Sequence, residues 1–395
     1  MFKINKNNKL YFNTIYCTII CTDKLIEFQY MKEVSQMKKS WPLDVTVSFD
    51  PYAGEPNRDG EQGAEILADG RVHFRIIAKD AKEVVIDRFG THFPLSPVAD
   101  GAWEGTFDMG TGFLYFFLKI DGADVLCPYL PIGYGCCRPM NFVDVPVPDM
   151  LGWDDLDSVP HGAVTRHYYP SSVTGKQEIC LVYTPPAWDP AKKLPVLYLQ
   201  HGYGENETGW VYQGHVGRIA DRLLAEGAME PMLIVMGNGM AVAADGTQDR
   251  GLFPKIIVND LIPFIESHYQ VLTDRDHRAM AGLSMGSFHT SVTTLTHPEL
   301  FAWAGLFSGF LRAPWAAEEE QPHLAFLKNP DEFNKAFRVF YRAMGTEDQF
   351  WDSFAKDDAW LEGKPLSIIR ETFPGGHDWT VWRRCIRSFL PRLFR

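Results

Sequence analysis

A serine between two glycines, in the run Gly282-Leu-Ser-Met-Gly286, is the part of this sequence best suited to chemistry. The Gly-x-Ser-x-Gly spacing lets a nucleophilic serine sit on a tight turn between a strand and a helix, because the glycines avoid clashes at the bend. The pentapeptide alone occurs by chance in roughly one chain of this length in ten. Here an apolar strand-like run precedes it and a helix-like run follows it, so we predict that Ser284 is a nucleophile.

A serine nucleophile needs a base, and hydrolases of this kind carry it downstream, in the order serine, acid, histidine. His377 lies in the glycine-rich run Phe-Pro-Gly-Gly-His-Asp-Trp, between the last predicted strand and the last predicted helix. Loops after strand carboxyl ends are where such sheets hold catalytic groups, so we predict His377 as the base. The other downstream histidines are predicted to be structural, solvent-facing or in a surface insertion: His289, His297 and His323.

The acid of the triad should come from the turn after the strand predicted at 338–343, which reads Gly-Thr-Glu-Asp-Gln. Asp348 is our choice there, and Glu347 is its alternative. Further along, Asp357 and Asp358 have the pattern of a solvated helix face. Asp378 adjoins the histidine, but its side chain is expected to point away from it.

The oxyanion of an acyl-transfer intermediate needs two backbone N–H donors. One should be the amide of Met285, directly after the nucleophile, and the other should come from the loop His-Gly-Tyr-Gly at 201–204, where Tyr203 is the candidate. We interpret His201 as a structural hydrogen-bonding residue, because His377 already fills the role of base.

The second half of the chain, 166–395, alternates short apolar runs with helix-like stretches, which favours a parallel sheet covered on both faces. The predicted strands are 178–183, 195–200, 232–236, 278–281, 302–307, 338–343 and 366–370. The predicted helices are 213–226, 256–269, 285–296 and 379–390. We therefore predict an α/β fold of the α/β-hydrolase type for this half.

The first half is predicted to be a small β-sandwich domain over 41–150, because strand-like runs recur between turn signals. In the strongest alternating run, Val72, Phe74 and Ile76 share one face, and Asp121-Gly122 signals a hairpin turn. Glycines and prolines over 133–165 are expected to interrupt regular structure, with the linker proper at 151–165. Residues 1–40 are predicted to be an N-terminal tail outside the fold.

Composition excludes several function classes. The net charge of −12 over 395 residues argues against a nucleic-acid partner, and no apolar run reaches the roughly 18 residues of a membrane span. Seven scattered cysteines without zinc spacing favour reduced thiols. We thus predict no metal, no organic cofactor and a cytoplasmic location, with secretion as the alternative.

Taken together, these motifs resemble the esterase D-like superfamily, in particular the feruloyl esterases of carbohydrate esterase family 1. The resemblance covers 166–395 and rests on the segments 195–210, 260–268, 281–286, 301–309 and 375–379. It implies Ser284, Asp348 and His377 as the triad, with the amides of Tyr203 and Met285 in the oxyanion hole. The chain departs from the family's pattern at Ser287, where a glycine is usual. Segments within 69–128 are similar to early-set, immunoglobulin-like modules.

The resemblance implies hydrolysis of hydroxycinnamoyl esters of plant carbohydrate, or of small phenolic esters. The aromatic candidates for substrate binding are Trp210, Phe350, Trp351 and Trp379. Alternatives are a siderophore trilactone esterase, an acetyl-sugar esterase and, as a different class, a non-catalytic glycan-binding protein. The β-domain is expected to pack on the esterase domain and to shape its entrance or a homodimer contact.

Overall fold

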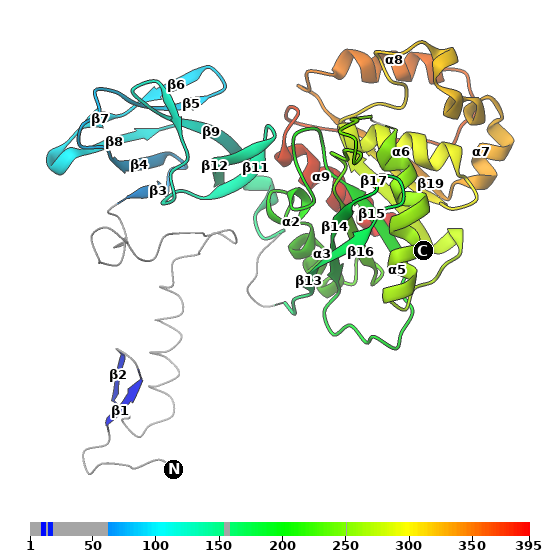
Figure 1. The fold of residues 1–395 in the computed structure, drawn as a ribbon, viewed down its shortest axis with the longest axis horizontal. Helices are drawn as coiled ribbons and strands as arrows, with labels where there is room; N and C mark the ends of the chain where they lie inside the picture. The colour runs from blue at the N-terminus through cyan, green and yellow to red at the C-terminus, as the bar shows by residue number, and fades with distance from the viewer. Residues whose placement is uncertain (1–8, 13–14, 19–61, 154–158, 250) are drawn as a thin grey trace. The chain divides into compact units, whose positions relative to one another are not determined.

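The structure is a computed structural model, and it describes residues 9–12, 15–18, 62–153, 159–249 and 251–395 (Figure 1). The chain divides into two units, Met1–Asp44 and Val45–Arg395, and each is described by itself. In the first unit, β1 (Lys9–Phe12) pairs antiparallel with β2 (Ile15–Thr18). The rest of the predicted tail at 1–40 and the start of the predicted β-domain lie outside the described residues.

An eight-stranded mixed sheet forms the centre of the second half of the chain (Figure 1). Its first three strands in spatial order pair antiparallel and the others pair parallel. The order is β13 (Ala163–Pro170), β14 (Gln177–Thr184), β16 (Leu233–Gly237), β15 (Val196–Gln200), β17 (Arg278–Leu283), β18 (Trp303–Phe307), β19 (Val339–Gly345) and β20 (Ile369–Phe373). With the helices between the strands, this is the predicted α/β-hydrolase fold.

Helices connect these strands, as short βα units require. They are α2 (Gly209–Tyr212), α3 (Val216–Ala225), α4 (Leu252–Ile256), α5 (Ile262–His268), α6 (Met285–Thr296), α7 (Pro330–Ala336), α8 (Trp351–Leu361) and α9 (Trp379–Phe389), with a π-helical turn at Ile257–Leu261 joining α4 to α5. The predicted helix at 285–296 is confirmed at both ends. The sequence reasoning did not predict α7, and of α8 it expected only the helix face of Asp357 and Asp358.

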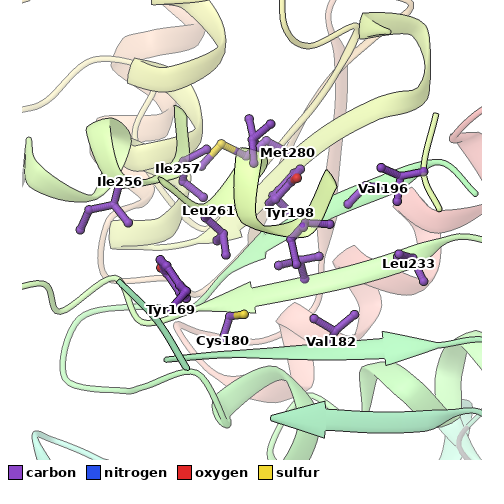
Figure 2. Packing of buried hydrophobic residues seen from close by; sticks show 14 of the residues in the cluster. Tyr169, Cys180, Val182, Val196, Tyr198, Leu233, Ile256, Ile257, Leu261 and Met280 are labelled. Atoms are coloured by element: carbon purple, nitrogen blue, oxygen red, sulfur yellow. The ribbon is translucent and has the colours of Figure 1, made fainter. Parts of the chain in front are cut away.

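One face of the sheet packs on α4, the π-helical turn and α5 (Figure 2). Alternate strand residues supply this core, because successive side chains of a strand point to opposite faces. Figure 2 shows Cys180 and Val182 of β14 and Tyr198 of β15 turned toward Leu261. On the opposite face, Phe389 of α9 packs edge-on against Phe307 of β18.

The region that precedes this sheet is made of two antiparallel sheets that share one core. The larger sheet contains β5 (Val84–Arg88), β6 (Thr91–Pro94), β9 (Gly112–Ile120), β10 (Ala123–Val125), β11 (Ile132–Gly135) and β12 (Arg138–Val145). The smaller contains β3 (Gly63–Ile66), β4 (Val72–Ile77), β7 (Ser96–Pro97) and β8 (Ala102–Phe107). Val72, Phe74 and Ile76 of β4 are all buried in the core, as predicted. The structure therefore shows a β-sandwich here, and its early-set character stays a prediction.

Two expectations about regular structure were wrong. The glycines and prolines of 133–165 do not prevent strands, since β11 and β12 extend the larger sheet and β13 begins at Ala163. The glycines fit because Gly133 and Gly135 lie directly over the ring of Tyr115, where a side chain would have little or no room. The last strand begins at Ile369 rather than at 366.

No helix within the described ranges is long and apolar enough to cross a membrane.

Candidate active site

Ser284 stands at a sharp turn between β17 and α6. Its backbone has φ 51° and ψ −114°, a conformation that residues with a Cβ rarely adopt. Its N–H donates a hydrogen bond of 2.9 Å to the carbonyl of Phe307 in the neighbouring strand β18. The sheet thus holds the serine in a strained position, as a nucleophile on a strand-to-helix turn requires.

The two glycines of the motif are needed because the turn brings backbone against backbone. A Cβ added to Gly282 would lie 2.5 Å from the carbonyl group of Gly286. A Cβ added to Gly286 would lie 2.6 Å from the carbonyl oxygens of Gln200 and His201 in the neighbouring chain segment. Neither position has room for a side chain, so both glycines are structural requirements of the turn.

Ser287, the departure from the family's pattern, is fully buried on the first turn of α6. Its side chain lies directly against the α-carbon of Gly309, where a Cβ would have no room. The serine therefore fits early in the helix because the residue facing it is a glycine.

His377 reaches Ser284 from the loop between β20 and α9, 93 residues further along the chain. Its Nε2 lies 3.0 Å from Oγ of Ser284, and its Nδ1 lies 2.9 Å from Oδ2 of Asp348. Asp378, predicted to point away, caps α9 by accepting the N–H of Val381 at 3.1 Å. The structure therefore brings together the predicted nucleophile, base and acid.

Asp348 and Glu347 differ in their surroundings, although they are adjacent. The carboxylate of Asp348 is buried, and its Oδ1 accepts the N–H of Phe350 at 2.8 Å. Glu347 is exposed to solvent. Only Asp348 faces the histidine, so the geometry favours it as the triad acid.

His201, predicted to be a structural hydrogen-bonding residue, lies directly after β15 and makes two hydrogen bonds to the backbone. The Nδ1 of His201 bonds the carbonyl of Gly202 at 2.8 Å, and its Nε2 accepts the N–H of Gly239 at 2.9 Å. Burial lowers the pKa of His201 to about 4, so its ring is neutral near pH 7. It supports the loop that follows β15.

The other three histidines have different environments. His289 is fully buried beside the ring of Phe253, whereas His297 is half-buried. The prediction of a surface insertion was wrong for His323, which is buried, and burial lowers its pKa to about 4.

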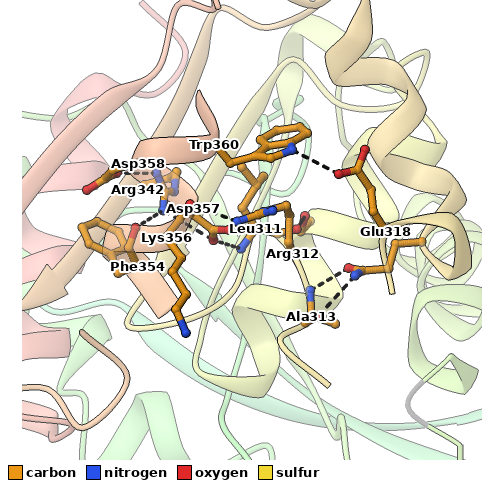
Figure 3. A network of polar contacts seen from close by, with 12 residues as sticks. Leu311, Arg312, Ala313, Glu318, Arg342, Phe354, Lys356, Asp357, Asp358 and Trp360 are labelled. Atoms are coloured by element: carbon orange, nitrogen blue, oxygen red, sulfur yellow. Dashed lines mark hydrogen bonds and ion pairs between the residues drawn. The ribbon is translucent and has the colours of Figure 1, made fainter. Parts of the chain in front are cut away.

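The prediction that Asp357 and Asp358 form a solvated face was also wrong (Figure 3). Asp357 is buried between two guanidinium groups, at 2.7 Å from Arg312 and 3.6 Å from Arg342. Asp358 pairs with Arg342 at 2.9 Å. Because Arg342 is itself almost fully buried, α8 must turn acidic groups inward to compensate its charge.

The two amides predicted for the oxyanion hole belong to two chain segments that both lie next to the serine. Met285 follows it in the chain, while a Cβ added to Gly202 would lie 3.4 Å from Cβ of Ser284. The loop with Tyr203 therefore lies next to the nucleophile, and the Tyr203 side chain is 66% exposed. Within the described part of the chain, neither of the two amides donates a hydrogen bond to the protein. Both are free to receive a substrate oxygen.

Glu205 lies beneath this loop, and sequence reasoning missed it. Its Oε2 accepts the N–H of Gly202 at 3.2 Å and its Oε1 accepts Nε1–H of Trp379 at 2.8 Å. Burial raises its pKa to about 8. The carboxyl group therefore joins the oxyanion loop to the start of α9, two residues after His377. An acidic residue directly after the Gly-Tyr-Gly run was the signal in the sequence.

The four aromatic candidates do not share one surface. Trp210 and Trp379 are 1% and 2% exposed and pack edge-on against each other, so their proposed role in lining a substrate site was wrong. Phe350 is half-buried with its ring 5.0 Å from that of His377. Trp351 packs on Phe354 instead. Of the four, Phe350 is the one that lies against the triad.

Comparison with known proteins identifies the family. A family model described as "Putative esterase" matches residues 171–393. The chain is 31% identical over 361 residues to an endo-1,4-beta-xylanase/feruloyl esterase of Xylanibacter ruminicola, an alignment that covers 86% of this chain and 47% of that protein. The chain thus spans about half the length of that curated relative.

Two solved structures share the fold. A ferulic acid esterase of Anaeromyces mucronatus in complex with ferulic acid has a TM-score of 0.54 at 22% identity, over 61% of this chain and 93% of that one. The enterobactin esterase of Shigella flexneri has a TM-score of 0.60 at 16% identity, over 83% of this chain and 94% of that one. Since the family model alone covers more than half of the 395 residues, the chain belongs to the esterase family that this model describes.

Proposed function

We propose that this protein is a serine hydrolase of carboxylic esters that works through an acyl-enzyme. The observation that carries the proposal is the unbroken contact from Asp348 through His377 to Ser284, with separations of 2.9 and 3.0 Å. A serine, an imidazole and a buried carboxylate in contact in this order form a nucleophile, its base and the group that orients the base.

In the first half of the reaction, Nε2 of His377 accepts the proton of Ser284 as its Oγ attacks the ester carbonyl. The tetrahedral intermediate carries a negative oxygen, which the amides of Tyr203 and Met285 stabilise. The imidazolium then donates its proton to the departing alcohol, and the acyl group stays on the serine. In the second half, His377 activates a water molecule that releases the acid.

Asp348 has two tasks in this scheme. It accepts Nδ1–H of His377, which leaves Nε2 as the nitrogen that faces Ser284, and it stabilises the imidazolium formed during attack. Its burial and its bond from the Phe350 amide fix its orientation.

For the substrate, we propose hydroxycinnamoyl esters of plant carbohydrate or small phenolic esters. Two observations support this class. The relative from Xylanibacter ruminicola is named an endo-1,4-beta-xylanase/feruloyl esterase, and the alignment with it covers 86% of this chain and 47% of that protein. Phe350 places an aromatic ring against His377, where a planar acyl group can stack.

An ester panel tests both levels of the proposal. Purified protein would be assayed with 4-nitrophenyl acetate, methyl ferulate, acetylated xylan and a catecholate trilactone, each also with Ser284→Ala. We expect methyl ferulate to give the highest kcat/KM and the variant to be inactive. A preference for acetylated xylan or the trilactone would support the acetyl-sugar or siderophore alternative, and full activity in the variant would refute the serine mechanism.

The remaining proposals concern the location of the protein, its oligomeric state and the binding of glycan. A cytoplasmic location and a homodimer would be tested by cell fractionation and by sedimentation. Retention of the full chain on glycan resin, with no turnover of any ester, would favour a glycan-binding protein instead.

A further inference from the structure

The two antiparallel sheets from β3 to β12, residues 63–145, form the β-rich region of the chain. The hairpin of β11 and β12 belongs to this region and reaches the loop that bears Tyr203. At its tip, the N–H of Cys137 donates a hydrogen bond of 2.8 Å to the carbonyl of Gly204. A Cβ added to Gly204 would lie 3.3 Å from the α-carbon of Cys136 and from the nitrogen of Cys137. The hairpin tip and the loop are therefore in direct backbone contact, with no side chain between them.

The tip holds an unusual backbone conformation. Cys136 and Cys137 have φ values of 49° and 62°, so two consecutive residues with a Cβ lie in the left-handed region. Two-residue hairpin turns of type I′ require this geometry, but asparagine and glycine usually occupy it because they adopt it at lower cost. A strained turn persists only where its surroundings fix it, and here Gly204 is what it contacts.

Next to its tip, the hairpin is anchored on the hydrolase fold. Tyr115 of β9 donates its hydroxyl to the carbonyl of Tyr134 at 2.9 Å. The side-chain amide of Gln213, directly after α2, donates both to that hydroxyl at 2.7 Å and to the same carbonyl at 2.9 Å. Gln213 is fully buried. This shared set of bonds fixes the hairpin at Tyr134, two residues before the tip.

The same β-rich region also holds α9, the helix that follows His377. Arg383 of α9 donates to both carboxylate oxygens of Asp144 in β12, at 3.0 and 2.6 Å, and its side chain is largely buried. Gly112 at the start of β9 lies so close to Thr380 that a side chain there would have no room. The β-rich region therefore contacts both the loop that bears Tyr203 and the helix that follows His377, the two segments that must meet at Ser284.

We propose that the β11–β12 hairpin is a positioning element of the active site, in which Cys136 and Cys137 hold the loop that presents the Tyr203 amide. The β-rich region is then a working part of the esterase. This inference rests on the proposed function, since the amide matters as an oxyanion donor. It concerns the backbone of the tip, and it gives the hairpin no contact with substrate.

The test inserts two glycines between Cys136 and Cys137 of the full chain, which lengthens the tip and removes the bond to Gly204. The matched control inserts two glycines between Gly122 and Ala123, in the β9–β10 hairpin of the same sheet. That turn is exposed, and nothing lies within 4 Å of a Cβ added to Gly122. Both variants would be measured for ester turnover, thermal unfolding and amide hydrogen exchange over residues 201–205.

We expect the tip insertion to lower kcat about 10- to 100-fold with KM within about twofold, because a misplaced oxyanion donor weakens transition-state binding alone. Exchange over 201–205 should accelerate in this variant, while the control matches the unaltered protein in both respects. Unchanged kcat and unchanged exchange in a folded tip variant would overturn the proposal. If the unaltered protein hydrolyses no ester, the proposed function fails, whereas faster exchange would still support the positioning role.

Should the tip insertion prevent folding, alkylation of the folded, unaltered protein with N-ethylmaleimide replaces it. Cys136 and Cys137 are exposed, and the other cysteines of residues 62–395 that the structure describes are buried. We expect alkylation to lower kcat and to speed exchange at 201–205, and a Cys136→Ser/Cys137→Ser variant to be insensitive to the reagent. Complete alkylation of both thiols without either effect would overturn the proposal.

Discussion

Replacement of Glu205 by glutamine tests how the site is held together. The carboxyl group receives two N–H donors, one from Gly202 and one from Trp379. The glutamine side chain has the same shape, but it presents an NH₂ group to one of these donors. Glu205→Gln should therefore loosen either the oxyanion loop or the start of α9.

The magnitude follows from the raised pKa of this buried carboxyl, about 8 against the ordinary value of 4.5. Between these two pH values the unfolded chain releases a proton that the folded chain keeps, so stability falls as pH rises. The slope for one such group is about 1.4 kcal/mol per pH unit. Below pH 4.5 this contribution is fully present, and it is lost as pH rises through about 8. The glutamine variant lacks it.

Urea unfolding from pH 5 to pH 8 measures this directly. The free energy of unfolding of the unaltered protein should fall more steeply with pH than that of Glu205→Gln. The difference between the two slopes should approach about 1.4 kcal/mol per pH unit. Glu347→Gln, at an exposed position, is the control and should keep the original slope. Parallel pH dependences in all three proteins would refute the reasoning, because they would mean that Glu205 is ionised throughout.

Three further substitutions test the site itself. Asp348→Asn should lower kcat by about 10⁴-fold, because an amide no longer selects the tautomer of His377 whose Nε2 accepts the proton of Ser284. Glu347→Gln should change kcat little. Equal effects of the two substitutions on kcat would contradict the choice of Asp348 as the acid. Gly286→Ala should lower the free energy of unfolding by about 1–3 kcal/mol in urea titrations, because its Cβ meets two carbonyl oxygens at 2.6 Å, and wild-type stability would show that the turn is looser than described. Phe350→Ala should raise KM for methyl ferulate more than for 4-nitrophenyl acetate, whereas a uniform change would assign the ring a role in the triad rather than in acyl binding.

Local patterns predicted much of this fold. The Gly-x-Ser-x-Gly turn and the helix after it could be predicted because they depend on steric limits between residues that are neighbours in the sequence. Alternation likewise identified the buried face of β4. His377 was found from its glycine-rich loop and from its order after Ser284.

The errors share one cause, which is that tertiary partners decided the outcome. β11 and β12 form despite their glycines because β12 pairs with β9 and β11 pairs with β12. Asp357 is buried because the arginines that compensate it come from other elements. Glu205 was missed because its place after the Gly-Tyr-Gly run does not show its second donor, Trp379, which is 174 residues away. Periodicity within a segment carries no signal for such contacts.

The central claim is that Ser284 is a nucleophile activated by His377, and covalent labelling measures it most directly. Intact-protein mass spectrometry would follow the reaction with a fluorophosphonate in the unaltered protein, Ser284→Ala and His377→Ala. The account predicts one adduct on Ser284, none in Ser284→Ala, and labelling in His377→Ala that is slower by at least about 100-fold. An adduct at another residue, or equal labelling rates with and without the histidine, would contradict it.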